Sequence, residues 1–538
     1  MTHKMTLVAA LWIVGFSLSP VFAQGAGQQS RTPNPAVQNP VDSGEVTRLL
    51  QSGNLDDAAK ATITTYMRNF FVRWTDQKNT ADLGKYRKDI QTLVEGVSNP
   101  QGKSTLLGLL AKALYDIAND TNKKDYYPAC RYNAVLTLGE LDEGVAADGR
   151  PKPYLKALDA LYQLYKNQGD GQDTTREAVR LGALHGIRRH VILGNIQTSN
   201  GQQIADLLIS IAADTPYENK NGGSAGTGPN PPENVIIIAT NPNALNTAEP
   251  QRTVELHNWF RNTAIGTLGY LSVAAGPTQN AIIDALLERI NDEAELPVIR
   301  YQCAYSLSRF NKTIETSPDL LKKTTGALLT LGLVIHDDGI QTMLDEQSTQ
   351  QTVGSMSGGM GGSMGGGMEG GMGMSPGGGM SGMYGGGTGS TMGQAQADQI
   401  NNSLIQIKDG FSSMIACIQG PDYRTGGLVN SEAVKETPYH EVLTGLNKTI
   451  TECVKFLDEG DPEAAKRAKQ QQTSGMDSMG MSMGSGMGTS STGATTTVKN
   501  QPKVTMKEIE DRLKIVKNDI ERLKGIMNAL DAGILASN

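Results

Sequence analysis

The sequence predicts an all-α protein. Three observations predict this class: a spacing pattern of Arg, Ala, Leu and Gly that recurs in mid-chain, heptad spacing of apolar residues near the C-terminus, and few aromatic residues. Hydrophobic residues make up 38% of the 538 residues and aromatic residues only 5%. This composition favours helical repeats with Leu, Ala and Ile cores over a large, aromatic-rich enzyme core.

The N-terminus has the features of a signal peptide over residues 1–23. Lys4 supplies the positive charge, the apolar stretch 7–18 is too short to span a bilayer, and Ala23 completes a small-residue cleavage site. We find no later transmembrane segment in the sequence. We therefore expect an exported protein, located in a periplasm or outside the cell.

Charge and cysteine content narrow the partners and the chemistry. The net charge of -7 is small and spread along the chain, whereas phosphate binding requires clustered Lys and Arg. We therefore expect no nucleic-acid partner. The chain has four cysteines, and Cys130, Cys303 and Cys453 fall within helical patterns. We interpret them as small buried core residues, although an exported protein can form disulfides and the sequence does not settle the pairing.

The next two regions differ in composition. Residues 24–44 are rich in Gln, Gly, Pro and Asn, which is typical of a flexible leader. Residues 45–125 are predicted to be a helical region that caps the middle of the chain, with helices near 82–97 and 103–119. One helical face in it is marked by residues at spacings of four, three and four: Ile63, Met67, Phe70 and Trp74.

The middle of the chain contains a repeated pattern. Arg, Ala, Leu, Gly and Leu occur at offsets 0, 3, 7, 8 and 10 in copies that begin at Arg131 and Arg261. A copy from Arg300 has conservative changes, and a copy from Arg180 is weaker. Offsets 0, 3, 7 and 10 lie on one helical face, and the small residue at offset 3 allows a neighbouring helix to approach closely.

Each copy precedes a second apolar helix, expected at 153–166, 202–213, 279–291 and 318–334. This alternation resembles HEAT repeats, in which a first helix pairs with a second and successive pairs stack into a superhelix. The resemblance covers residues 126–345 and implies an α-solenoid of HEAT-like helical pairs. We expect its first-helix arginines to tie adjacent repeats through carbonyls or acids, and not to form a site.

The spacing of the copies indicates one insertion. The step from Arg180 to Arg261 is 81 residues, whereas the other two steps are 49 and 39. Asn, Gly and Pro dominate the extra chain, so we predict a loop insertion at about 215–250 and not a hidden repeat. Within it, Val235-Ile-Ile-Ile238 is consistent with a strand or an extended segment.

The composition changes abruptly after the predicted solenoid. Residues 346–393 and 471–502 are rich in Gly, Met, Ser and Thr, a composition that buries too little surface to fold, so we predict disordered linkers. Between them lies a predicted helical island, 394–470. Apolar residues alternate spacings of four and three in the island and again in 503–536, which predicts coiled-coil-type helices. These helices bundle within the chain or form a homo-oligomer through 503–536, and the spacing favours neither.

Two short motifs resemble sites of known chemistry. Gly102-Lys103-Ser104-Thr105 resembles the end of a phosphate-binding loop, but that loop requires a Gly where Val97 stands. We predict a helix start after Asn99-Pro100 instead. His336-Asp337-Asp338 could ligate a cation, but it is interpreted as a polar helix end.

The methionine tract offers a metal alternative. Met residues recur every four positions, and thioether sulfur is a ligand suited to Cu(I); the candidate ligands are Met356, Met360, Met364, Met368 and Met372. The tract contains neither His nor Cys, so a flexible linker is the preferred interpretation.

Together these patterns predict a non-enzymatic protein–protein interaction scaffold or adaptor. Protein partners would bind to the solenoid and to the C-terminal heptad helices. We expect no catalytic residues and no cofactor. Two alternatives stay open: a Met-rich, Cu(I)-binding protein, and an enzyme with an unrecognised site in the insertion at 215–250.

Overall fold

The computed structural model describes residues 42–53, 55–75, 77–119, 126–167, 176–194, 196, 198–214, 254–272, 276–357, 388–421, 427–460 and 506–532. The predicted signal peptide and the insertion lie outside the described residues. So do most of the leader and most of both predicted linkers. The structure therefore tests the predictions made for the helical regions of the chain.

The described residues are predominantly helical, which confirms the all-α class. The exception is a small antiparallel sheet, β1 (Asp142–Val145) and β2 (Pro151–Pro153), which pairs Val145 with Pro151. Gly149 turns the chain between the strands with a φ of 81°, a conformation that glycine adopts without a steric penalty. The hairpin was not predicted, because it is too short to produce a clear alternation of apolar and polar residues.

The chain divides into two compact units, with the boundary between Arg289 and Ile290, so the boundary falls inside the predicted 126–345 region. The first unit contains these helices: α1 (Ser43–Ser52), α2 (Asp57–Thr75), η2 (Gln77–Asp82), α3 (Leu83–Glu95), α4 (Pro100–Asn119), α5 (Pro128–Gly139), α6 (Leu155–Lys166), α7 (Arg176–Ile192), α8 (Thr198–Ala213), α9 (Val254–Leu268), η4 (Gly269–Leu271) and most of α10 (Gly276–Asn291).

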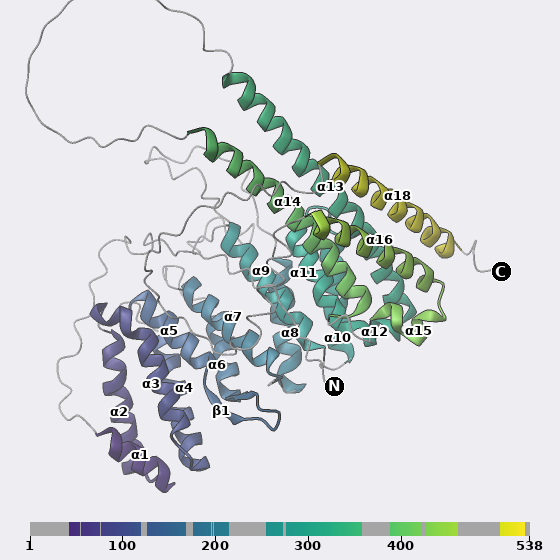
Figure 1. Ribbon diagram of the computed structural model, residues 1–538. Helices are drawn as coiled ribbons and strands as arrows, with labels where there is room; N and C mark the ends of the chain where they lie inside the picture. Colours follow the sequence, from purple (N-terminus) through teal and green to yellow (C-terminus); the bar gives the residue numbers. More distant parts are fainter. Residues whose placement is uncertain are drawn as a thin grey trace, which may run out of the picture. The chain divides into compact units, whose positions relative to one another are not determined.

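Helices of the first unit pack on their neighbours in sequence order (Figure 1). Three of the four helices that carry the repeated pattern form one row, because α5 contacts α7 and α7 contacts α9. The helix α4 contacts both α5 and α6, and α6 contacts α7. The helices α7 and α9 are thus in direct contact, although they are separated in sequence by α8 and by the residues of the predicted insertion.

Small residues set how closely these helices approach. Ala134, Ala183 and Ala264, at offset 3 of their copies, have no exposed surface. A Cβ added to Gly139 of α5 would lie 2.8 Å from Cα of Gly186 in α7, so these two backbones are nearly in contact. The pattern therefore specifies close helix packing, as expected from its small residues.

The face of α2 differs in one position from the prediction. Ile63, Met67 and Trp74 are buried, but Phe71 is buried in place of Phe70. Phe70 packs edge-on against Phe71, with ring centroids 5.7 Å apart. Positions three and four residues after Met67 lie on nearly the same helical face, so spacing alone does not choose between them.

The second unit holds the remaining helices: the end of α10, α11 (Pro297–Leu307), η5 (Ser308–Phe310), α12 (Asn311–Glu315), α13 (Pro318–Ser357), α14 (Thr388–Gln419), η6 (Leu428–Asn430), α15 (Glu432–Lys435), α16 (Tyr439–Gly460) and α18 (Met506–Asp531). Both α13 and α14 run into the predicted linker 346–393, so helix is present at both of its ends.

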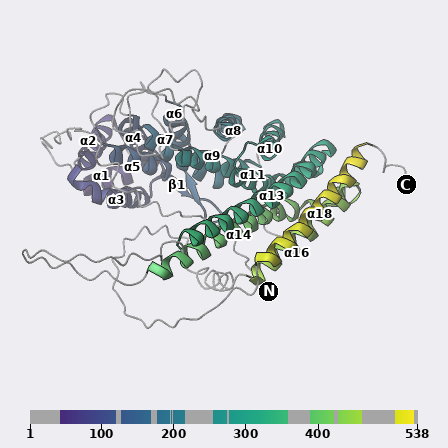
Figure 2. The same ribbon diagram turned by 90° about the horizontal axis from the view of Figure 1, so that it is seen from above.

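Four long helices of this unit form a bundle. The contacts close a ring, because α13 packs on α14, α14 on α16, α16 on α18 and α18 on α13 (Figure 2). The heptad residues of α18 are buried in it: Ile509, Leu513, Val516, Ile520, Leu523 and Met527. The heptad seam thus packs within the chain, which is the intramolecular one of the two alternatives.

Glycines of the bundle receive the side chains of α18. A Cβ on Gly332 of α13 would lie 2.7 Å from Cδ1 of Ile520, and one on Gly445 of α16 would lie 2.9 Å from Cδ2 of Leu523. Any larger residue at these two positions would push α18 outward. The bundle therefore depends on glycines that carry no heptad signal of their own.

The interpretation of His336-Asp337-Asp338 as a helix end is wrong, because α13 continues to Ser357. His336 is buried, and its Nδ1 lies 2.8 Å from Oδ1 of Asp337. The same oxygen accepts a hydrogen bond of 2.9 Å from Nζ of Lys517 in α18. Burial raises the pKa of Asp337, but the hydrogen bonds from Lys517 and His336 outweigh it and hold the pKa below its usual value. The hydrogen bond between Lys517 and Asp337 thus links α18 to α13.

The packing of Gly102 generates a stability prediction. A Cβ at this position would clash with the backbone carbonyl of Leu50 in α1, which cannot move as a side chain end can. We expect Gly102→Ala to lower the unfolding free energy of the first unit by about 1–3 kcal/mol, measured by calorimetry on the full chain. The matched control is Gly84→Ala in α3, where no atom lies within 4 Å of the added Cβ. Equal effects of the two substitutions would contradict the packing described.

Candidate binding groove

Four arginines, one from each copy of the repeated pattern, make the same hydrogen bond. The Nε of Arg131 donates to the carbonyl of Ala118 at 3.0 Å, and Nε of Arg261 donates to that of Ala212 at 3.1 Å. In the other copies, Arg180 donates to Tyr165 at 3.1 Å, and Arg300 donates to Ile290 at 2.7 Å. Every acceptor is the next-to-last residue of the preceding helix.

This bond joins the end of one helix to the helix that follows it and carries the repeated pattern. The four joined pairs are α4 with α5, α6 with α7, α8 with α9 and α10 with α11. The last carbonyls of a helix have no partner within the helix and carry the negative end of its dipole. A buried guanidinium, in turn, requires acceptors; Arg261 is only 1% exposed. The expectation that these arginines are structural and bind carbonyls of an adjacent helix is therefore confirmed.

The hairpin adds a second tie around α5, α6 and α7. Arg189 of α7 binds both carboxylate oxygens of Asp142 in β1 at 2.8 Å and the carbonyl of Gly139 at 3.1 Å. After β2, the backbone N–H of Tyr154 donates to the carbonyl of Leu141 at 2.8 Å. These bonds fix Tyr154 at the start of α6, where its ring faces α4.

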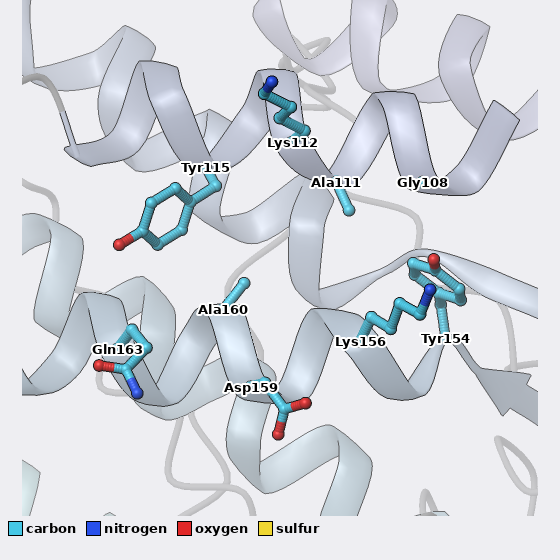
Figure 3. Close-up of a pocket in the computed structure, with 9 residues that line it drawn as sticks. All are labelled: Gly108, Ala111, Lys112, Tyr115, Tyr154, Lys156, Asp159, Ala160 and Gln163. Atoms are coloured by element: carbon cyan, nitrogen blue, oxygen red, sulfur yellow. The ribbon is translucent and has the colours of Figure 1, made fainter. Parts of the chain in front are cut away.

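A groove of about 420 Å³ lies between α4 and α6 (Figure 3). Its lining residues are Gly108, Ala111, Lys112 and Tyr115 from α4, with Tyr154, Lys156, Asp159, Ala160 and Gln163 from α6 and the residue before it. Ala111 and Ala160 lie between the two helices, and Tyr115 and Tyr154 stand at opposite ends (Figure 3). The groove therefore has a narrow apolar floor with an aromatic ring at either end.

Polar groups occupy the rims of the groove. Lys112 on α4 and Lys156 on α6 are exposed, and neither has an ion-pair partner among the residues that the structure describes. Asp159 accepts a hydrogen bond of 3.1 Å from Asn200 of α8. Burial, and secondarily Glu143, raise the pKa of Tyr154, so its hydroxyl stays protonated near neutral pH. The groove thus offers hydrogen-bond donors around an apolar floor.

The candidate Cu(I) ligands and the Gly102-Lys103-Ser104-Thr105 motif do not line this groove. Among the candidate Cu(I) ligands, Met356 is in the last turn of α13, where side chains are not described, and the others lie outside the described residues. Gly102-Lys103-Ser104-Thr105 lies in the first turns of α4. There, Oδ1 of Asn99 accepts hydrogen bonds of 3.0 Å from the N–H groups of Gln101 and Gly102. The predicted helix start is confirmed.

The described residues also bear on metals, cysteines and membranes. No group of three or more His, Cys, Asp or Glu side chains among them could hold a metal ion. The four cysteines, all described, are buried, and none forms a disulfide. In the described part of the chain, no helix combines the length and apolar character needed to cross a membrane.

Sequence reasoning missed the groove itself. Lys112 and Lys156 are 44 positions apart and each, on its own, is indistinguishable from a solvated lysine. The available signal was the presence of the small residues Gly108, Ala111 and Ala160 on two predicted helices.

Comparisons of the chain with family models, with curated proteins and with solved structures give no match.

A buried histidine of α7 generates a pH prediction. Burial, assisted by the neighbouring Arg189, lowers the pKa of His190 from 6.5 to about 3. Below pH 6.5 the unfolded chain therefore binds a proton that the folded chain excludes, so stability decreases as pH decreases, by up to about 1.4 kcal/mol per pH unit. We expect His190→Gln to flatten the decrease of Tm between about pH 6.5 and 4. Parallel Tm profiles for the variant and the native chain would show that His190 is not responsible.

Proposed function

We propose that residues 126–345 form a HEAT-like α-solenoid and that the protein is a non-enzymatic interaction scaffold or adaptor in an exported compartment. The observation that supports this most directly is the arginine-to-carbonyl bond, which recurs at four helix-to-helix steps. A bond repeated at equivalent positions is what stacked structural repeats require, since each repeat must join its neighbour in the same way.

The packing of the first unit supports the same proposal. The row α5, α7 and α9 places the first helices against one another, and the contact of α4 with α6 begins a row of second helices. A row of pattern-bearing helices, each packed against a helix next to it in sequence, is the arrangement expected of a solenoid built from helical pairs. The exported location rests on the predicted signal peptide at residues 1–23.

The groove supplies the surface for a scaffold. The groove has a volume of about 420 Å³ and is open to solvent, so it would suit a few residues of an extended segment lying between the two helices. Tyrosine is among the residues most enriched where proteins bind each other, because its ring is apolar and its hydroxyl is polar. We therefore propose that a protein partner binds between α4 and α6.

Filling the groove tests this function. In Ala160→Trp the indole would occupy the apolar floor, whereas Ser104→Trp places the same side chain at an exposed position of α4 outside the groove. The full-length variants are immobilised and exposed to the exported fraction of the source cells, and retained proteins are quantified by mass spectrometry. We expect Ala160→Trp to retain at least about tenfold less of a specific protein than Ser104→Trp. Identical sets of retained proteins would overturn the proposal.

A further inference from the structure

We propose that the α4–α6 groove recognises an acidic extended segment, in which an apolar side chain enters between the tyrosines and neighbouring carboxylates meet Lys112 and Lys156. This inference rests on the proposed function and specifies the chemistry of the partner. Its basis is the balance of charge at the groove, which is unlike that of the whole chain.

The charged side chains that line the groove are two lysines and one aspartate, and they differ in their bonding partners. Lys112 and Lys156 stand on opposite rims and have no ion-pair partner within the described part of the chain. The only lining carboxylate, Asp159, accepts a hydrogen bond from the neutral amide of Asn200 and keeps its negative charge. Asp116 lies one turn after Lys112 on α4 but does not line the groove. Two lysines and one carboxylate give the lining a net charge of +1, although the chain as a whole carries -7.

The floor selects for an apolar side chain. Ala111 is buried and Ala160 is half-buried, so they present methyl groups and no hydrogen-bonding atoms. At Gly108, a Cβ would lie 3.7 Å from the hydroxyl oxygen of Tyr154, which shows that the glycine leaves room beside that ring. An aliphatic or aromatic side chain between Tyr115 and Tyr154 would bury apolar area on both sides.

Lysines suit this role because they reach outward from the rims. An exposed ammonium group gains little from a single carboxylate, since water and salt screen the attraction. Two lysines on opposite rims can pair with two carboxylates flanking one apolar anchor, which adds selectivity more than affinity. The recognition should therefore be sensitive to charge and to ionic strength.

Fluorescence anisotropy with defined peptides tests this proposal on the full chain. The probes are short fluorescein-labelled peptides that share one Leu and one Phe and differ only in carrying Glu, Gln or Lys beside them. We expect the Glu peptide to bind about five- to tenfold more tightly than the Gln peptide at low salt. The double variant Lys112→Glu/Lys156→Glu should reverse this order in favour of the Lys peptide. A matched control, Lys85→Glu/Lys88→Glu, changes two exposed lysines of α3 outside the groove and should leave the order unchanged.

The outcomes separate this inference from the proposed function. Equal binding of the three peptides, abolished by Ala160→Trp, would overturn the acidic preference while supporting a peptide groove. The acidic preference would also be overturned if no peptide bound, or if Ala160→Trp did not weaken the binding of any peptide. In that case, loss of a specific partner from Ala160→Trp in the capture experiment would still support the scaffold. If the control Lys85→Glu/Lys88→Glu reversed the peptide order as strongly as Lys112→Glu/Lys156→Glu does, the overall charge of the protein, and not the groove, would be attracting the peptides.

Discussion

The hydrogen bond from an arginine Nε to the next-to-last carbonyl of the preceding helix is the interaction that joins successive helices at four places in the chain. It satisfies a backbone acceptor that has no partner within its own helix, and it gives a buried guanidinium the acceptor that it requires. Bonds to charged donors contribute about 1.5–3 kcal/mol each, and loss of one partner costs more because the other stays buried. At the α8–α9 step the contact is reinforced, since Nε2 of His257 lies 2.5 Å from the carbonyl of Asp214.

This bond fixes the end of one helix against the start of the next. Small residues then determine how closely neighbouring helices approach. Gly139 and Gly186 bring α5 and α7 together, and Gly108, Ala111 and Ala160 lie where α4 and α6 face each other. The groove is thus a consequence of the same packing. The second unit uses glycine differently: Gly332 and Gly445 accept the heptad side chains of α18, and a bond between Lys517 and Asp337 fastens that helix.

The sequence predicted the helical class, most helix positions and the structural role of the arginines, because these depend on local spacing and on a repeated chemical need. It did not predict which of Phe70 and Phe71 is buried, since both lie near the same helical face. It placed His336-Asp337-Asp338 at a helix end, because a polar triplet in an otherwise apolar helix has no local sign of its partner, Lys517, which lies 180 positions away. The hairpin escaped it because the two strands are too short to show an alternation of apolar and polar residues, and the groove escaped it because its lining residues lie on two helices far apart in sequence.

Native-state hydrogen exchange on Arg261→Met tests the central claim most directly. Methionine retains much of the apolar length of the side chain but removes the Nε–H that binds Ala212. If the bond joins α8 to α9, backbone amides in the last turn of α8 and the first turns of α9 should exchange about 10- to 100-fold faster than in the native chain. Amides of α13, α16 and α18 should be unaffected. Unchanged exchange in α8 and α9, or a uniform increase throughout the chain, would contradict the account.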